Sequence, residues 1–178
     1  MTDREHLEYN ALRATIRERG TARVYIFATG FAVWSALVVA TAALAFPPVA
    51  TLLPLLVLLA IFEAVFALHV GVERIGRYLR VFHERDQSAR WEEAAAAFGR
   101  PKGAPAVDPL FSIPFFVAAL FNAAPALIVQ PTWPELVFIG GAHALFVLRL
   151  LVAREASRRQ RAIDQARFEE LKTKSVER

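Results

Sequence analysis

The residues best suited to chemistry are four polar side chains that lie inside apolar stretches: Glu63, Asn122, His143 and Arg149. Counted from the neighbouring turns at about 1.5 Å per residue, Glu63 lies roughly 20 Å along its helix and Arg149 roughly 23 Å along another. An isolated charge at such a depth in hydrocarbon is costly, so each requires a partner. We therefore predict an ion pair between Glu63 and Arg149, which is either structural or part of a proton or ion relay.

The two neutral polar residues also call for partners. Asn122 and His143 are expected at a similar depth, where they can hydrogen-bond to each other or to a backbone carbonyl. Histidine also ligates haem iron, so a haem or pigment held by His143 or His69 is an alternative. One iron cannot use both, because His69 lies about 15 Å deeper by helical rise. His6 and His83 fall in polar segments and are expected to be solvated.

Recognisable enzyme motifs are missing from the chain. It contains no GxGxxG, Walker loop, HExxH or nucleophile elbow. The absence of cysteine excludes disulfides, iron–sulfur clusters and thiolate zinc sites. Acidic residues alternate with basic ones and the net charge is only +4, which argues against a nucleic-acid-binding surface. These observations predict a protein that is not an enzyme, with no bound metal and no nucleic-acid partner.

The elements that position these residues follow from the hydropathy of the chain. Positions 24–62 contain no charged side chain, and 56% of all residues are apolar, with a mean hydropathy of +0.36. Each span of about 20 apolar residues can cross roughly 30 Å of hydrocarbon as a helix. We predict an all-α, polytopic integral membrane protein with four transmembrane helices in two hairpins, at 24–46, 50–70, 110–129 and 134–152.

The distribution of charge predicts the orientation. All 21 Lys and Arg residues lie in 1–23, 71–109 and 149–178, and the two turns have none. By the positive-inside rule both termini and the central loop are cytoplasmic, and Tyr25 and Trp133 suit the two membrane boundaries. The full chain, 1–178, is expected to be a single membrane domain. Its cytoplasmic extensions are a helix in 1–23, a helix in 71–98, a linker in 99–109 that ends in Asp108 as helix cap, and a helical tail in 153–178.

Small residues mark two helix faces. Ala28, Ala32, Ala36 and Ala40 recur at four-residue spacing in the first span, and Gly140 and Gly141 lie in the fourth. Such a pattern lets another helix approach closely. It has two interpretations: packing inside the monomer, or an interface with another subunit.

Basic residues gather where the last span meets the cytoplasm, at Arg154, Arg158, Arg159 and Arg161. Each can add about 1 kcal/mol of attraction to an anionic leaflet. They are interpreted either as topology anchors or as contacts to anionic lipid head groups.

Three segments carry a resemblance. They are EYNALR at 8–13, ERIGRYLR at 73–80 and Trp91-Glu92. Together they resemble a group of uncharacterised small bacterial four-helix membrane proteins with an EYxALR, RIGxYLR and WE pattern, and this implies the inner membrane of a bacterium but no activity. The chain is less similar to SLATT-type membrane effectors, from which its four predicted spans depart. The shared stretch places Arg74, Arg77, Tyr78 and Arg80 just below the membrane, where lipid or another subunit could bind.

Three functions are compatible with these features. The first is an accessory or scaffold subunit that docks on a larger membrane complex. The second is a homo-oligomeric channel or membrane effector lined by the sparse polar residues of the spans, among them Thr29, Ser35 and Thr41. The third is a haem- or pigment-binding membrane subunit. The first is favoured, because catalytic groups are missing and small-residue faces are present.

Overall fold

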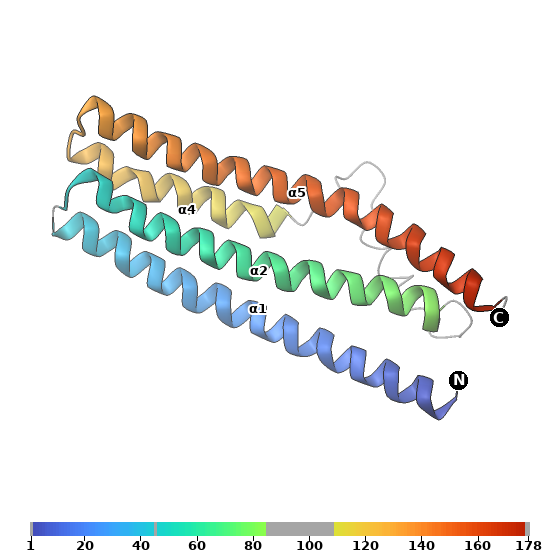
Figure 1. Cartoon of the computed structure of the whole chain (residues 1–178). Helices are drawn as coiled ribbons and strands as arrows, with labels where there is room; N and C mark the ends of the chain where they lie inside the picture. The colour runs from blue at the N-terminus through green and yellow to red at the C-terminus, as the bar shows by residue number, and fades with distance from the viewer. Residues whose placement is uncertain (1, 45, 85–108, 177–178) are drawn as a thin grey trace. The chain divides into compact units, whose positions relative to one another are not determined.

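The computed structural model describes residues 2–44, 46–84 and 109–176, and this part of the chain is entirely helical apart from its short turns. The described residues form four α-helices: α1 (Asp3–Ala43), α2 (Leu52–Leu79), α4 (Pro109–Ile128) and α5 (Trp133–Val176). A 3-10 turn, η1 (Pro48–Thr51), precedes α2, and a π-helical turn, η2 (Arg80–Glu84), follows it. The all-α prediction is confirmed (Figure 1).

The contacts divide the chain into two compact units. The first, called here the apolar unit, comprises 23–66 and 108–154. The second, called the polar unit, comprises 1–22, 67–107 and 155–178. Since α1, α2 and α5 each contribute to both, each unit is described by itself below.

Short sequence signals set the helix ends. Thr2 and Glu5 form a capping box at the start of α1, in which the Thr2 N–H donates to Glu5 Oε2 at 2.7 Å. The same T-x-x-E pattern recurs before α5, where the backbone and hydroxyl groups of Thr132 donate to Glu135 Oε2 at 2.9 and 2.7 Å. At α1 the Glu5 N–H also donates to Thr2 Oγ1 at 3.4 Å, which satisfies a donor that the first helical turn leaves unpaired.

Prolines shape the connections between the helices. Pro47 and Pro48 lie between α1 and α2, where the lack of a proline N–H and the fixed φ prevent continuation of α1. Pro114 and Pro125 fall inside α4, where packed neighbours can compensate for the lost backbone bonds. Beyond Ile128, Gln130 takes a left-handed conformation with φ 56°, and this turn leads into α5.

Phe115 of α4 lies at the centre of the apolar unit and is fully buried. Its ring meets Phe31 of α1 and Phe62 of α2 edge-on, each with a centroid distance of 5.3 Å. Such aromatic pairs add about 0.5–1.5 kcal/mol beyond the burial of their area. Phe146 of α5 completes the contact to Phe62 at 6.5 Å, so all four helices share one core.

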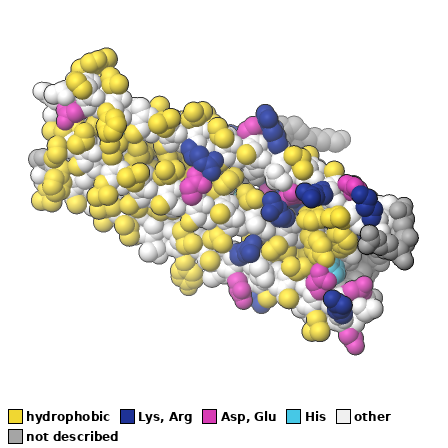
Figure 2. Space-filling view, viewed as in Figure 1, with side chains coloured by type: hydrophobic (Ala, Val, Ile, Leu, Met, Phe, Trp, Pro, Cys, Tyr) yellow, Lys and Arg dark blue, Asp and Glu magenta, His cyan; other side chains and the backbone are white. Residues whose placement is uncertain are grey.

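Within the described part of the chain, three helical segments are long and apolar enough to cross a membrane: Asp3–Ala43, Pro48–His83 (η1, α2 and part of η2) and Trp133–Lys174. The apolar part of α4 is shorter, at 17 residues (Ser112–Ile128). Hydrophobic side chains cover the visible face of the apolar unit (Figure 2). Those of Leu120, Ile128 and Trp133 are exposed over more than 70% of their area, as expected for surfaces that lie against lipid rather than water.

The helix boundaries differ modestly from the predicted spans. α1 ends at Ala43 rather than at 46, and α2 begins at Leu52 rather than at 50, because the prolines and η1 occupy the turn. The helix predicted over 71–98 is described as far as Glu84, and its last described residues, Arg80–Glu84, form a π-helical turn. The rest of that prediction, the linker and the cap at Asp108 lie outside the described residues.

A close approach between α1 and α2 gives a first test. A Cβ at Gly30 would lie 2.5 Å from Ile61 Cγ1, whereas one at Gly140 would meet nothing within 4 Å. Overpacking costs about 1–3 kcal/mol, and alanine gains at most about 1 kcal/mol of helix propensity. We expect Gly30→Ala to lower the midpoint of thermal unfolding in detergent and Gly140→Ala to maintain or raise it. Equal midpoints for the two variants would show that the contact does not constrain the fold.

Candidate functional site

Asn122 is completely buried and lies at the centre of a polar network in the apolar unit. Its Oδ1 accepts a hydrogen bond from Trp34 Nε1 at 3.1 Å, and its Nδ2 donates to the carbonyl oxygen of Thr51 at 2.9 Å. The second Nδ2 hydrogen faces His143 Nε2 at 3.1 Å. One amide thereby joins α1, η1, α4 and α5, and both of its donor hydrogens are used.

The His143 ring has both nitrogens engaged. Its Nδ1 lies 2.8 Å from the carbonyl oxygen of Ile139, one turn earlier in α5. Since a carbonyl can only accept, Nδ1 carries the proton, and Nε2 then accepts from Asn122. The lone pair that a metal or haem iron would need is directed at an amide hydrogen. This geometry argues against His143 as an axial ligand.

The other haem candidate, His69, lies in the polar unit. Its Nε2 is 3.5 Å from Glu73 Oε1, one turn further along α2. Among the described residues no group of three or more His, Cys, Asp or Glu side chains could hold a metal ion. Both His69 and His143 thus take part in side-chain networks.

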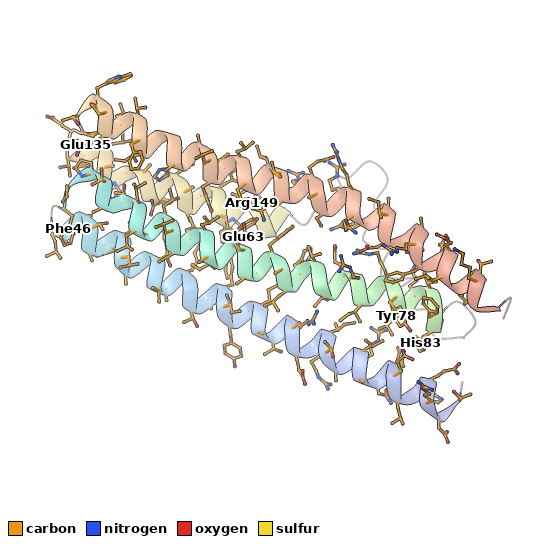
Figure 3. The ribbon with its side chains drawn as sticks, in the orientation of Figure 1. Phe46, Glu63, Tyr78, His83, Glu135 and Arg149 are labelled. Carbon is orange, nitrogen blue, oxygen red and sulfur yellow. The ribbon has the colours of Figure 1, made fainter. Side chains whose placement is uncertain are left out.

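Glu63 of α2 and Arg149 of α5 face each other on the surface of the apolar unit (Figure 3). Arg149 Nε donates to Glu63 Oε1 at 2.6 Å, and its Nη2 donates to Oε2 at 2.7 Å. The guanidinium also lies over the rings of Phe62 and Phe66, about 6 Å from each centroid. A bidentate pair of this kind is geometrically well defined, yet both side chains remain about 40% exposed.

The alanine ridge of α1 points away from the core of the apolar unit. Ala28, Ala32 and Ala36 are exposed and Ala40 is half-buried, because Phe27, Phe31 and Trp34 occupy the opposite, inward face. Gly140 and Gly141 on α5 are likewise exposed. Close packing within the unit instead uses Gly30, so the structure leaves the predicted small-residue faces uncovered.

In the polar unit, most of the arginines predicted to contact lipid or a partner bind acidic residues of the chain itself. Arg74 Nε and Arg77 Nη2 donate to Asp164 Oδ2 at 3.2 and 2.9 Å, and Gln160 donates to its Oδ1 at 2.7 Å. Burial by itself would raise the pKa of Asp164, but these hydrogen bonds outweigh it and lower that pKa below its usual value.

A second group of ion pairs also joins α2 to α5 in the polar unit. Arg161 binds Glu73 through Nη2 at 2.6 Å and through Nε at 3.1 Å. Arg77 approaches the same carboxylate at 3.5 Å. Glu73 and Asp164 thereby bind three of the predicted basic residues.

Tyr78 and His83 lie near α1 in the polar unit. The Tyr78 hydroxyl donates to Glu8 Oε1 at 2.7 Å, and burial followed by this bond raises the pKa of Tyr78 to about 12. The expectation that His83 is solvated is wrong. His83 is only 7% exposed, because its ring packs beside those of Tyr9 and Tyr78, at centroid distances of 5.8 and 5.9 Å.

The remaining predicted basic residues differ in their exposure. Arg158 and Arg159 are exposed, and Arg159 pairs with Glu155 at 2.8 Å within its own helix. Arg154 and Arg80 are half-buried. Arg158 and Arg159 are therefore both accessible to a lipid head group.

Sequence reasoning missed the residues that complete these networks: Trp34, Thr51, Glu8, Glu73 and Asp164. No sequence pattern distinguishes Trp34 and Thr51 from the other residues of the apolar stretches. The acidic partners could have been predicted, because Glu73 and Asp164 each lie three or four residues from an arginine, the spacing of neighbours on one helix face.

No protein-family model, curated protein or solved structure matches the chain. The resemblance to small bacterial membrane proteins thus stays a prediction, and the function has to be argued from the geometry above.

Removal of the Asn122 amide tests the central network. Asn122→Leu leaves the Trp34 indole N–H, the His143 imidazole and the Thr51 carbonyl without their partner, and each buried unsatisfied group costs about 1–3 kcal/mol. We expect a large drop in the unfolding midpoint and a change in tryptophan fluorescence. Asn10→Ala on the exposed side of α1 is the matched control and should leave both unchanged. An Asn122→Leu variant as stable as the wild type would contradict the network's structural role.

The Tyr78–Glu8 bond predicts a pH dependence of the polar unit. The folded-state pKa of about 12 exceeds the usual value of about 10, so the neutral phenol is favoured by folding. The stabilisation is complete below about pH 10 and is lost as the pH rises through about 12. An absorbance titration of tyrosinate should contain a late step that Tyr78→Phe removes and Tyr25→Phe retains. A late step that persists in Tyr78→Phe would refute the assignment.

Proposed function

We propose that the protein is a non-enzymatic integral membrane subunit that docks laterally, through its helices and its polar extensions, on a larger membrane assembly. The observation that carries the proposal is the outward alanine face of α1. Ala28, Ala32 and Ala36 lie opposite the residues that form the core, and small residues allow the backbone of another transmembrane helix to approach closely. The occupant that fits is a transmembrane helix of a different protein.

The proposed topology has four crossings, with both termini in the cytoplasm of a bacterium and the protein in its inner membrane. The apolar part of α4 reaches about 26 Å at 1.5 Å per residue, near the lower limit for a span. Basic residues avoid both turns. Tyr25 and Trp133, which are 70% and 74% exposed, suit the two interfaces, where their rings can meet head groups.

The interior of the apolar unit supports a packing role rather than a ligand-binding one. Asn122 and His143 satisfy each other and nearby backbone or indole groups. Thr41 donates to its own helix at Val38. These groups are already hydrogen-bonded, which weakens the haem or pigment alternative.

The second candidate is a homo-oligomeric channel or membrane effector. It is favoured by the exposure of Thr29 and Ser35 next to the alanine ridge, which would place hydroxyl groups along a shared axis if copies of α1 surrounded it. Two hydroxyls per chain make a sparse lining, so this function ranks second.

Purification of the tagged protein in mild detergent tests the proposal. We expect a native mass well above 19.8 kDa, with foreign membrane subunits present and no visible absorption band. Ala32→Leu fills the alanine face and should reduce foreign subunits by on the order of tenfold, the effect of about 1.4 kcal/mol. Val33→Leu, at an exposed neighbour that is already large, should retain them.

Foreign subunits retained by Ala32→Leu would refute docking through this face. Material that contains only copies of this chain would refute the accessory role and favour the channel. A visible band that disappears in His143→Ala or His69→Ala would favour the cofactor alternative.

A further inference from the structure

The ion pair of Glu63 and Arg149 lies in an exposed position on the surface of the apolar unit. Each side chain keeps about 40% of its area exposed. The pair lies amid exposed apolar side chains, Leu56 on α2 and Leu145 and Leu148 on α5. Figure 2 shows charged groups surrounded by hydrophobic ones at this place, and Figure 3 labels the two residues there. The pair is the polar centre of an otherwise apolar face, called here the α2/α5 face.

The pair retains unused hydrogen-bonding capacity. Arg149 binds Glu63 through Nε and Nη2, while the two hydrogens on Nη1 have no acceptor among the described residues. Each carboxylate oxygen of Glu63 has a further lone pair. For charges removed from water, the loss of hydration is offset only when the remaining hydrogen-bonding groups are satisfied. A partner on this face should therefore present both an acceptor for Arg149 and a donor for Glu63.

The direction of the pair restricts what that partner can be. α2 and α5 run in the same direction (Figure 1). The Phe62–Phe146 and Glu63–Arg149 contacts accordingly follow each other in the same order along both helices. The line from carboxylate to guanidinium consequently runs across the helices, at one depth. Rotation by 180° about an axis parallel to the helices reverses this line and leaves its depth unchanged.

We propose that two copies of this chain pair through the α2/α5 face about such a twofold axis. Glu63 of each copy then lies opposite the Arg149 side chain of the other copy, and the four charges form a closed alternating ring. A symmetric interface presents the same patch on both sides, so the patch must be self-complementary. A transverse ion pair fulfils this condition, and the axis parallel to the helices is the one that keeps both copies in the same membrane orientation.

The surrounding side chains permit the approach. Ala60, about one turn before Glu63 on α2, is exposed, and its small size lets another helix come close. The α2/α5 face is separate from the alanine ridge of α1, so a dimer leaves the ridge open. This inference goes beyond the proposed function and does not depend on it, since copies can pair whether or not foreign subunits bind.

Charge reversal with mixing tests the ring. Glu63→Arg gives a copy with two arginines on the face, and Arg149→Glu gives a copy with two glutamates. Either variant alone should lose the dimer by on the order of tenfold or more, measured as co-purification of two differently tagged copies. Co-expression of the two variants should restore pairing, since every facing charge is then opposite in sign. Pairing absent from the mixture but present in wild type would overturn the ring.

Cross-linking keeps the proposal testable if the charge variants fail to fold. The chain has no cysteine of its own, so introduced thiols react only with each other. Ala60→Cys in one copy and Leu145→Cys in another should form a disulfide between copies, at twice the mass of 19.8 kDa, because the axis places α2 of one copy opposite α5 of the other.

The control is a pair of copies that carry Leu120→Cys, on the face of α4, where the side chain is 74% exposed. It should give little product. Equal yields from the control and the test pair would refute the interface. Absence of the cross-link, with each copy bound to lipid or to a foreign protein instead, would assign the face to that occupant and overturn the dimer.

Discussion

A single buried amide constrains the apolar unit more than any other group. In a medium without water, a backbone or side-chain polar group must find its partner in the protein, and Asn122 provides partners for three others at once. It fixes the indole of Trp34, the end of η1 at Thr51 and the ring of His143 in one arrangement. The aromatic core around Phe115 packs on helices whose register this amide sets. Apolar contacts alone would tolerate sliding along the helix axes, whereas directed hydrogen bonds do not.

The same requirement explains where the surfaces are open. Because the interior of the apolar unit satisfies the polar groups around Asn122, two of the features that the described chain leaves open lie on its surface: the alanine face of α1 and the Glu63–Arg149 pair. One is apolar and shallow, which suits a closely packed foreign helix. The other is charged and self-complementary, which suits a second copy. If both proposals hold, the protein can pair with itself and still bind another subunit.

In the polar unit, ion pairs join the helices. Its helices are joined by carboxylates, Glu73 and Asp164, that each bind more than one arginine. Three arginines that the sequence predicted to contact lipid or a partner, Arg74, Arg77 and Arg161, therefore hold α2 against α5 in the polar unit. Burial would raise the pKa of Asp164, but hydrogen bonds from Gln160, Arg77 and Arg74 lower it. Burial and the bond to Glu8 raise the pKa of Tyr78, so both groups keep their bonding form over the physiological pH range.

The sequence by itself determined that the chain is helical and where its apolar stretches lie. Apolar composition, prolines and capping residues each act on the backbone of their own segment. It also indicated Glu63 with Arg149 and Asn122 with His143, since helical rise alone estimates the depth of each. Only the tertiary structure decided which helix faces turn inward. The alanines of α1 satisfy the spacing rule for packing, yet the larger side chains Phe31 and Trp34 fill the core and turn those alanines outward. Rotation about a helix axis is set by the neighbours against which the side chains pack, and the pattern of one segment does not contain those neighbours.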